Sequence, residues 1–234
     1  MKKYTKVMTA NSANHKIVKD FYGLDTEIMP ENSILDESIH LQAESNVSED
    51  GILKILWVGS KESRKALEYL LYALSDLDAL NIDFRLSVVG NANEHLGWRS
   101  LSRILNINEK ISWVGKISMA EVNNLYKQAD INVITSLMEG NPTVLWESMS
   151  KGVPTIVFDT CGMSDVVNSR CGYKIKITNK DLMIDELKKL LIKLSDKNNI
   201  IKKESVIDYA KTNAWSIRER RLKLIYESLD ESSN

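Results

Sequence analysis

Apolar and polar residues follow two patterns along this chain. One pattern predicts β-strands and the other predicts α-helices. Short runs of mostly apolar residues predict strands buried in a parallel sheet, because such strands are covered on both faces. These runs lie at residues 6–9, 26–29, 52–58, 84–89, 110–114, 131–135, 154–158 and 173–177. Other segments repeat apolar residues every three or four positions, which is the spacing of one helix face. They lie at residues 13–22, 64–77, 96–105, 118–128, 142–151, 180–194, 200–211 and 216–229. Alternating strands and helices predict an α/β fold with a parallel sheet.

Local capping signals set several of the expected helix ends. Ser63 precedes the helix expected over residues 64–77 and is expected to cap it. Ser118 and Glu121 have the spacing of a capping box, which predicts a helix start. Gly152 is expected as the C-cap of the helix before it.

Composition and charge argue against several classes of protein. The formal net charge is −1 over 234 residues, so the chain has no overall basic character of the kind that binds nucleic acid. The two cysteines lack metal-ligand spacing and make no disulfide framework. The first residues carry charge without the apolar core of a signal peptide. No apolar run approaches the ~18 residues that a membrane span needs. We therefore expect a cytoplasmic protein.

Two carboxylates separated by seven residues are the most informative chemical feature. Glu139 follows the apolar run at residues 131–134, and Glu147 lies within the next helical segment. Ligands of open parallel sheets bind beyond the carboxyl ends of the strands, where both acids are expected. There, a carboxylate accepts hydrogen bonds from sugar hydroxyls, and a helix N-terminus holds a phosphate. The alternative is an ordinary solvated loop acid and a helix acid.

A second candidate site is the turn from Gly59 to Lys65. It follows a predicted strand and opens a predicted helix, which is the arrangement of an anion site. Gly59 allows close approach of the backbone. Arg64 and Lys65 are expected at the positive end of the helix dipole, where a cation is unfavourable without an anion. The alternative for both is an exposed helix end.

These motifs together resemble the retaining GT-B glycosyltransferases of family 4, which use nucleotide sugars. The resemblance runs from about Ile52 to the C-terminus and is strongest over Ile111–Val167, which contains EGNPTVLWE. It implies a Rossmann-like parallel sheet with helices on both faces, forming one half of a GT-B fold. By this resemblance, residues 1–30 are a remnant of the N-terminal domain, residues 31–50 a linker and residues 51–234 the nucleotide-sugar-binding domain.

The resemblance also implies a role for each matching residue. Lys65 contacts the diphosphate and Glu139 the donor hexose, and these two form the expected catalytic pair. Glu147 is expected on the ribose hydroxyls. Ser60 departs from the family pattern, which has arginine there. The rest of the expected donor-binding set is Gly59, Ser60, Arg64, Gly90, Lys116, Ile117, Gly140, Asn141, Thr143 and Val144.

The implied reaction is transfer of a hexosyl unit with retention, without a metal or cofactor, in surface-polysaccharide assembly. The acceptor would be a glycan or lipid-linked molecule, in the cytoplasm or at the inner membrane face. The missing N-terminal GT-B half, or a second copy of the chain, is the expected partner, and the isolated chain is expected to be inactive. A sugar-nucleotide epimerase and a non-catalytic nucleotide-sugar-binding module are the alternatives. Asp76 and Asp78 have the spacing of a metal-binding pair, but they are expected at a helix end.

Overall fold

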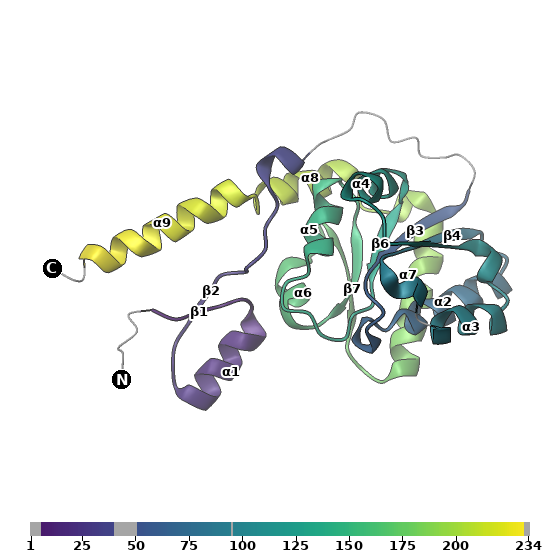
Figure 1. Cartoon of the computed structure of the whole chain (residues 1–234), viewed down its shortest axis with the longest axis horizontal. Helices are drawn as coiled ribbons and strands as arrows, with labels where there is room; N and C mark the ends of the chain where they lie inside the picture. The colour runs from purple at the N-terminus through teal and green to yellow at the C-terminus, as the bar shows by residue number, and fades with distance from the viewer. Residues whose placement is uncertain (1–5, 40–50, 95, 232–234) are drawn as a thin grey trace.

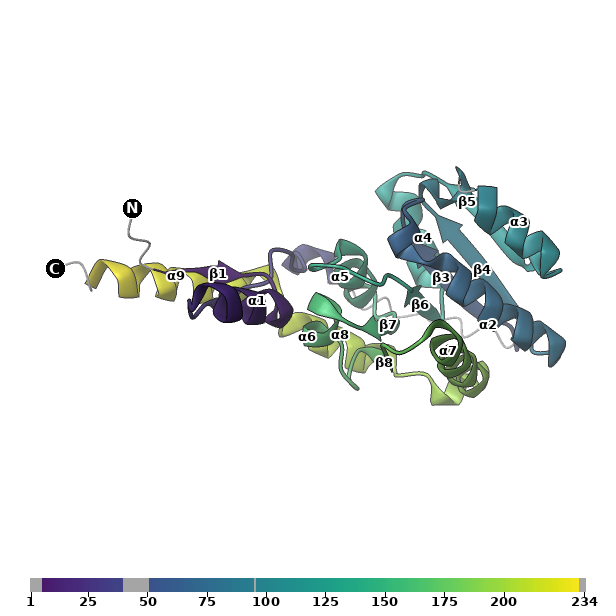
Figure 2. The ribbon, with the colours of Figure 1, turned by 90° about the horizontal axis from the view of Figure 1, so that it is seen from below.

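The computed structural model describes residues 6–39, 51–94 and 96–231. Its central feature is a six-stranded parallel sheet with the strand order β5-β4-β3-β6-β7-β8 (Figure 1; all six strands are labelled in Figure 2). The strands are β3 (Leu53–Val58), β4 (Phe84–Val89), β5 (Ile111–Gly115), β6 (Ile131–Ile134), β7 (Thr155–Asp159) and β8 (Gly172–Lys176). The order reverses between β3 and β6, so the topological switch point of this Rossmann-like sheet lies where these two strands end.

Helices cover both faces of the sheet, as the sequence predicts. Side chains of β3 alternate between the two layers: Ile55 and Trp57 belong to the core beneath α2 and α7, whereas Leu56 packs with Val122 and Tyr126 of α4. A third core cluster joins α5 and α8 to β6 and β7. The helices of this part are α2 (Leu67–Ala79), α3 (Leu96–Ile104), α4 (Met119–Gln128), α5 (Thr143–Ser150), α6 (Cys161–Val166), α7 (Lys180–Ser195) and α8 (Lys203–Lys211).

Residues 6–39 form a separate element, which we call the N-terminal arm. It contains β1 (Met8–Thr9), α1 (Ser12–Tyr22) and β2 (Glu27–Ile28), and the two strands pair in parallel. The long helix α9 (Trp215–Glu231) runs beside the arm (Figure 2), where Arg221 lies 3.0 Å from Glu27. Ile34 is buried at 2% exposure and forms a β-bridge with Ala214. Residues 40–50 of the expected linker lie outside the described residues.

The expected start of α2 is wrong. The helix begins at Leu67, residues 63–65 form a 3-10 turn, and Ala66 takes the left-handed conformation with φ 46°. The reason is tertiary: the carbonyl of Arg64 accepts a hydrogen bond from Leu137 N, and that of Lys65 accepts one from Thr135. Both carbonyls are held by the loop after β6, and Ser63 caps no helix.

Other local signals hold to within a residue. The capping box of Ser118 and Glu121 is present at the start of α4. The C-cap of α5 is Lys151, and Gly152 follows it with φ 72°. Residues 161–166, which follow β7 and were not among the predicted helices, form the short helix α6. Trp215 is 41% exposed at the start of α9.

Candidate functional site

The candidate site lies at the switch point, where the turn after β3 meets the loop between β6 and α5. We call residues 135–142 the acid loop. Trp57 of β3 donates its indole N–H to Thr135 Oγ1 at 3.0 Å, and Thr135 Oγ1 donates to the carbonyl of Lys65 at 2.7 Å. These bonds join two segments about seventy residues apart in the sequence. The tertiary fold therefore brings the two sequence motifs together.

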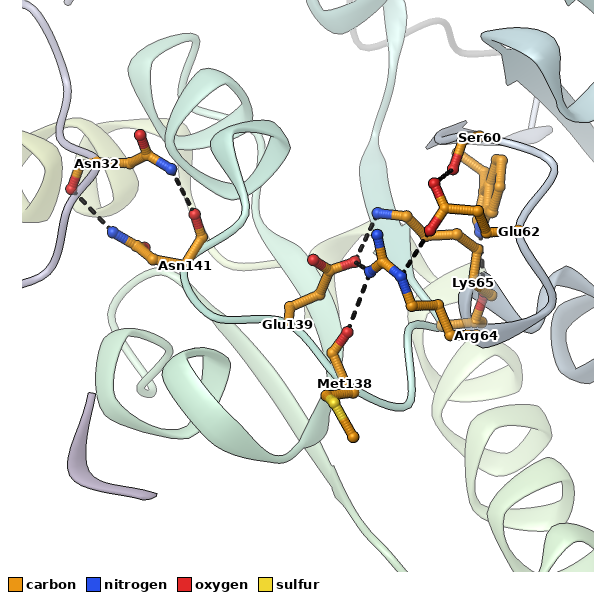
Figure 3. A network of polar contacts seen from close by, with 10 residues as sticks. Asn32, Ser60, Glu62, Arg64, Lys65, Met138, Glu139 and Asn141 are labelled. Carbon is orange, nitrogen blue, oxygen red and sulfur yellow. Dashed lines mark hydrogen bonds and ion pairs between the residues drawn. The ribbon is translucent and has the colours of Figure 1, made fainter. Parts of the chain in front are cut away.

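Glu139 is the centre of an ionic cluster in this site. Its Oε1 lies 2.5 Å from Lys65 Nζ and 2.7 Å from Arg64 Nη1 (Figure 3). The side chains of Glu139 and Lys65 are 11% and 14% exposed, so this pair is largely withdrawn from water. Arg64 also lies 2.7 Å from Glu62, and Ser60 donates to Glu62 at 2.9 Å. Burial opposes the charged form of Arg64, but the carboxylates of Glu139 and Glu62 outweigh it and raise the pKa of Arg64.

Glycines allow the backbone turns of this region to approach one another closely. A Cβ on Gly59 would lie 2.5 Å from the ring of Trp57. Gly90 has φ 99°, and a Cβ there would lie 2.2 Å from the carbonyl oxygen of Gly59. The N–H of Gly90 in turn donates to the carbonyl of Gly115 at 2.8 Å. Side chains are therefore excluded where the turns after β3 and β4 touch.

The carbonyls of the acid loop are held from outside the sheet. Gly162 N of α6 donates to Glu139 O at 3.3 Å, and Asn11 of the arm donates to Gly140 O at 3.1 Å. A Cβ on Gly162 would lie 1.7 Å from the carbonyl oxygen of Gly140, so only glycine fits there. This close contact with α6 fixes the loop beside Glu139.

Helix α5 supplies the second part of the site. Thr143 and Val144 occupy its first two positions, where backbone N–H groups have no partner within the helix. Pro142, just before them, has no N–H to donate. Such an N-terminus favours an anion.

A cavity of about 260 Å³ runs along α5, from Thr143 at the first position of the helix past Glu147 to Lys151 at its C-cap. Its other walls come from α4 and the arm, including Asn123, Met119 and Leu35. Glu147 accepts a long hydrogen bond of 3.4 Å from the hydroxyl of Tyr126. Burial raises the pKa of Glu147, and the Tyr126 hydrogen bond only partly opposes this. A half-buried carboxylate with one weak protein donor is suited to accept hydrogen bonds from a ligand.

The residues expected from the sequence thus fall into three groups. Gly59, Ser60, Arg64, Lys65, Gly90 and Glu139 lie around the ends of β3, β4 and β6. Thr143, Val144 and Glu147 lie on α5 beside the cavity, while Lys116 and Ile117 follow the end of β5. Gly140 and Asn141 connect the first two groups, and the side chain of Asn141 contacts Asn32 and Trp146.

Besides the bond from Asn11, other contacts with the arm were not foreseen from the sequence. Ser12, the first residue of α1, donates its N–H and hydroxyl to the carboxylate of Asp165 at 2.7 and 2.5 Å. Asn32 pairs with Asn141. The only local signal was the N-cap chemistry of Asn11 and Ser12, which says nothing of residues more than a hundred positions away.

Asp76 and Asp78, whose spacing is that of a metal-binding pair, each contact a lysine. They pair with Lys188 and Lys110, at 3.6 and 2.7 Å. Within the described ranges, no group of three or more His, Cys, Asp or Glu side chains is placed to hold a metal ion. In the same part of the chain, no helix is long and apolar enough to cross a membrane.

Comparison with known proteins agrees with the family that the sequence motifs resemble. The family model described as glycosyl transferases group 1 matches residues 39–211. An uncharacterized glycosyltransferase of Methanocaldococcus jannaschii is 26% identical over 158 residues, which cover 67% of this chain and 40% of that protein. The chain therefore spans less than half the length of this curated relative.

Two solved structures share the fold at low identity. The apo form of the lipopolysaccharide outer core galactosyltransferase WaaB has a TM-score of 0.79 at 18% identity, covering 95% of this chain and 62% of that one. HepE of Anabaena, solved in complex with UDP, has a TM-score of 0.78 at 14% identity, covering 96% of this chain and 64% of that one. These two matches support the GT-B assignment of the fold.

Proposed function

The chain belongs to the glycosyl transferases of group 1, and we propose that it is the nucleotide-sugar-binding part of a retaining hexosyltransferase. The proposed role of this chain in the transfer reaction is to hold the donor and to stabilise the leaving diphosphate. It rests above all on one observation, the convergence of Arg64 and Lys65 on Glu139 beside the N-terminus of α5.

The diphosphate is proposed to lie between Lys65 and the first turn of α5. In the free protein Glu139 and Glu62 neutralise the two cations. A bound diphosphate would compete for the same donors, and Arg64 would supply the positive charge that Ser60 lacks in place of the family's arginine. The N–H groups of Thr143 and Val144 would donate to phosphate oxygens, as helix N-termini do. Displaced from its cations, Glu139 would accept hydrogen bonds from the hexose.

The nucleoside is proposed to extend toward Glu147. Its carboxylate would accept hydrogen bonds from both ribose hydroxyls, and the cavity beside it supplies room. The base would then lie near Lys116 and Ile117, where main-chain groups follow the end of β5. HepE was solved with UDP, which makes UDP a suitable first probe for this chain.

In the proposed reaction, the bond between the anomeric carbon and the diphosphate oxygen breaks, and a bond to the acceptor hydroxyl oxygen forms. The acceptor proton leaves with the diphosphate. Lys65 and the α5 N-terminus would stabilise the growing negative charge, which is electrostatic catalysis by preorganised donors. Neither a metal nor a cofactor is part of the proposal. The proposed acceptor is a glycan or lipid-linked molecule in surface-polysaccharide assembly, met in the cytoplasm or at the inner membrane face.

Calorimetric titration with UDP, GDP and ADP tests the proposed donor site. We expect one of the three to bind with a stoichiometry of one, and Lys65→Met to abolish or strongly weaken that binding. Failure of all three to bind the folded chain would refute the proposal.

A non-catalytic donor-binding module remains the second candidate, because the chain spans less than half the length of its curated relative. Transfer needs a positioned acceptor and a cleft that excludes water. We therefore expect negligible transfer by the chain alone and measurable transfer once a matching N-terminal half is added. No turnover with that half present would favour the module, whereas efficient transfer by the chain alone would mean that it needs no second half.

A further inference from the structure

The arm holds two of three successive carbonyls in the acid loop. Asn11 donates to the carbonyl of Gly140, and Asn32 donates to that of Asn141 at 2.6 Å. The preceding carbonyl, that of Glu139, is held by α6. The segment that carries the central acid is thus restrained by residues more than a hundred positions earlier in the chain.

The contact between Asn32 and Asn141 is reciprocal. Asn32 Nδ2 donates to Asn141 O, and Asn141 Nδ2 donates to Asn32 O at 3.0 Å (Figure 3). The remaining amide oxygen of Asn141 accepts the indole N–H of Trp146 at 2.6 Å. Asn141 is only 5% exposed. Removing one partner would leave a buried polar group unsatisfied, which costs more than the bond itself contributes.

Arg218 of α9 supports this pair from behind. Its guanidinium donates to the carbonyl of Pro30 at 2.9 Å and to that of Asn32, and it lies 5.4 Å from the ring centre of Trp146. The residue is 9% exposed, and burial lowers its pKa. Its described hydrogen bonds go to backbone carbonyls of the arm. The cation therefore fixes the arm against α5.

We propose that Asn32 is a positioning residue for the donor site and that Arg218 holds Asn32 in place. Asn141 lies two residues after Glu139 and two before Thr143, so fixing its backbone fixes both the acid and the helix N-terminus. Preorganised groups bind without first having to be ordered. The inference rests on the proposed function, because it is the donor that these groups are held to meet.

The test compares Asn32→Ala with Asn14→Ala, a matched control at an exposed position of α1. Two measurements on the free chain report on the loop itself. The first is the NMR signal of the Trp146 indole N–H, assigned with Trp146→Phe. The second is amide hydrogen exchange across residues 139–144. We expect Asn32→Ala to shift the indole signal and speed exchange, and Asn14→Ala to do neither.

Titration with UDP then reports on positioning. We expect Asn32→Ala to weaken UDP binding about fivefold to tenfold, because binding must then order a loop that one buried hydrogen bond no longer holds in place. Asn32→Asp keeps the shape but replaces the donor with an acceptor, so it should weaken binding at least as much. Arg218→Gln should act in the same direction as Asn32→Ala. Arg220→Gln, its control at an exposed position of the same helix, should not.

The outcomes separate this inference from the proposed function. If the wild-type chain binds none of the three nucleotides, the proposed function fails, and the loop signals alone decide whether Asn32 positions the loop. Unchanged loop signals in Asn32→Ala would overturn the inference. So would a loosened loop that still binds UDP with wild-type affinity.

Discussion

Replacing Glu147 with glutamine should change stability and nucleotide binding in opposite directions. Burial raises the pKa of this carboxyl, so its ionised form is disfavoured in the folded protein. Glutamine has nearly the same shape, carries no charge, and offers an amide oxygen that still accepts the Tyr126 hydroxyl, 3.4 Å from the carboxylate in the wild type. The variant should therefore be more stable than the wild type near neutral pH.

The pH dependence of this difference follows from linkage. Below the ordinary glutamate pKa of 4.5, Glu147 is protonated in both states and the two proteins should have similar stability. As the pH rises, the unfolded chain loses this proton first, so the wild type loses stability until the raised folded pKa is passed. The advantage of Glu147→Gln should thus be near zero at about pH 4 and full at about pH 8. Urea unfolding at both pH values measures it.

Binding should change the other way. Hydrogen bonds to a charged group contribute about 1.5–3 kcal/mol, and weakening the ribose contact by that amount lowers affinity roughly ten- to a hundredfold. Calorimetric titration with the nucleotide that the wild type binds gives this number. Glu186→Gln, at a 61% exposed side chain on α7, is the control and should leave both properties nearly unchanged. A Glu147→Gln variant that is less stable near pH 8, or that binds with unchanged affinity, would refute the reasoning.

Three further changes test other parts of the site. Nucleotide affinity should be the same with and without EDTA, and a strict metal requirement would contradict the proposed use of Lys65 and α5. Lys65→Met should weaken nucleotide binding and should leave the carboxylate of Glu139 only partly compensated by Arg64. The free energy of unfolding, measured in urea, should therefore fall by about 1–3 kcal/mol. An unchanged free energy of unfolding would mean that the buried pair is energetically neutral. Gly162→Ala should lower the melting temperature, because its Cβ would lie 1.7 Å from the carbonyl oxygen of Gly140; a wild-type melting temperature would show that the acid loop moves aside at little cost.

Elements whose signals are local could be predicted from the amino-acid sequence alone. Apolar runs predicted every strand of the main sheet to within about one residue, because burial on both faces demands apolar side chains throughout. The capping box at Ser118 formed because its partners lie three residues apart. The motifs around Glu139 and Lys65 likewise pointed to one site, since parallel strands end at the same edge of a sheet.

Features that depend on distant partners could not be predicted in this way, because they form only when the folded chain brings those partners together. Helix α2 starts late because carbonyls of Arg64 and Lys65 are held by residues about seventy positions away. The acid loop is fixed through Asn32, which lies 109 positions before Asn141, and through Arg218, 186 positions after Asn32. A polar side chain can satisfy its hydrogen bonds locally, in water or across the fold, and the sequence around it does not distinguish these outcomes. Packing of the arm and α9 against the sheet domain determines which partners these side chains contact, and it thereby sets the geometry of the site.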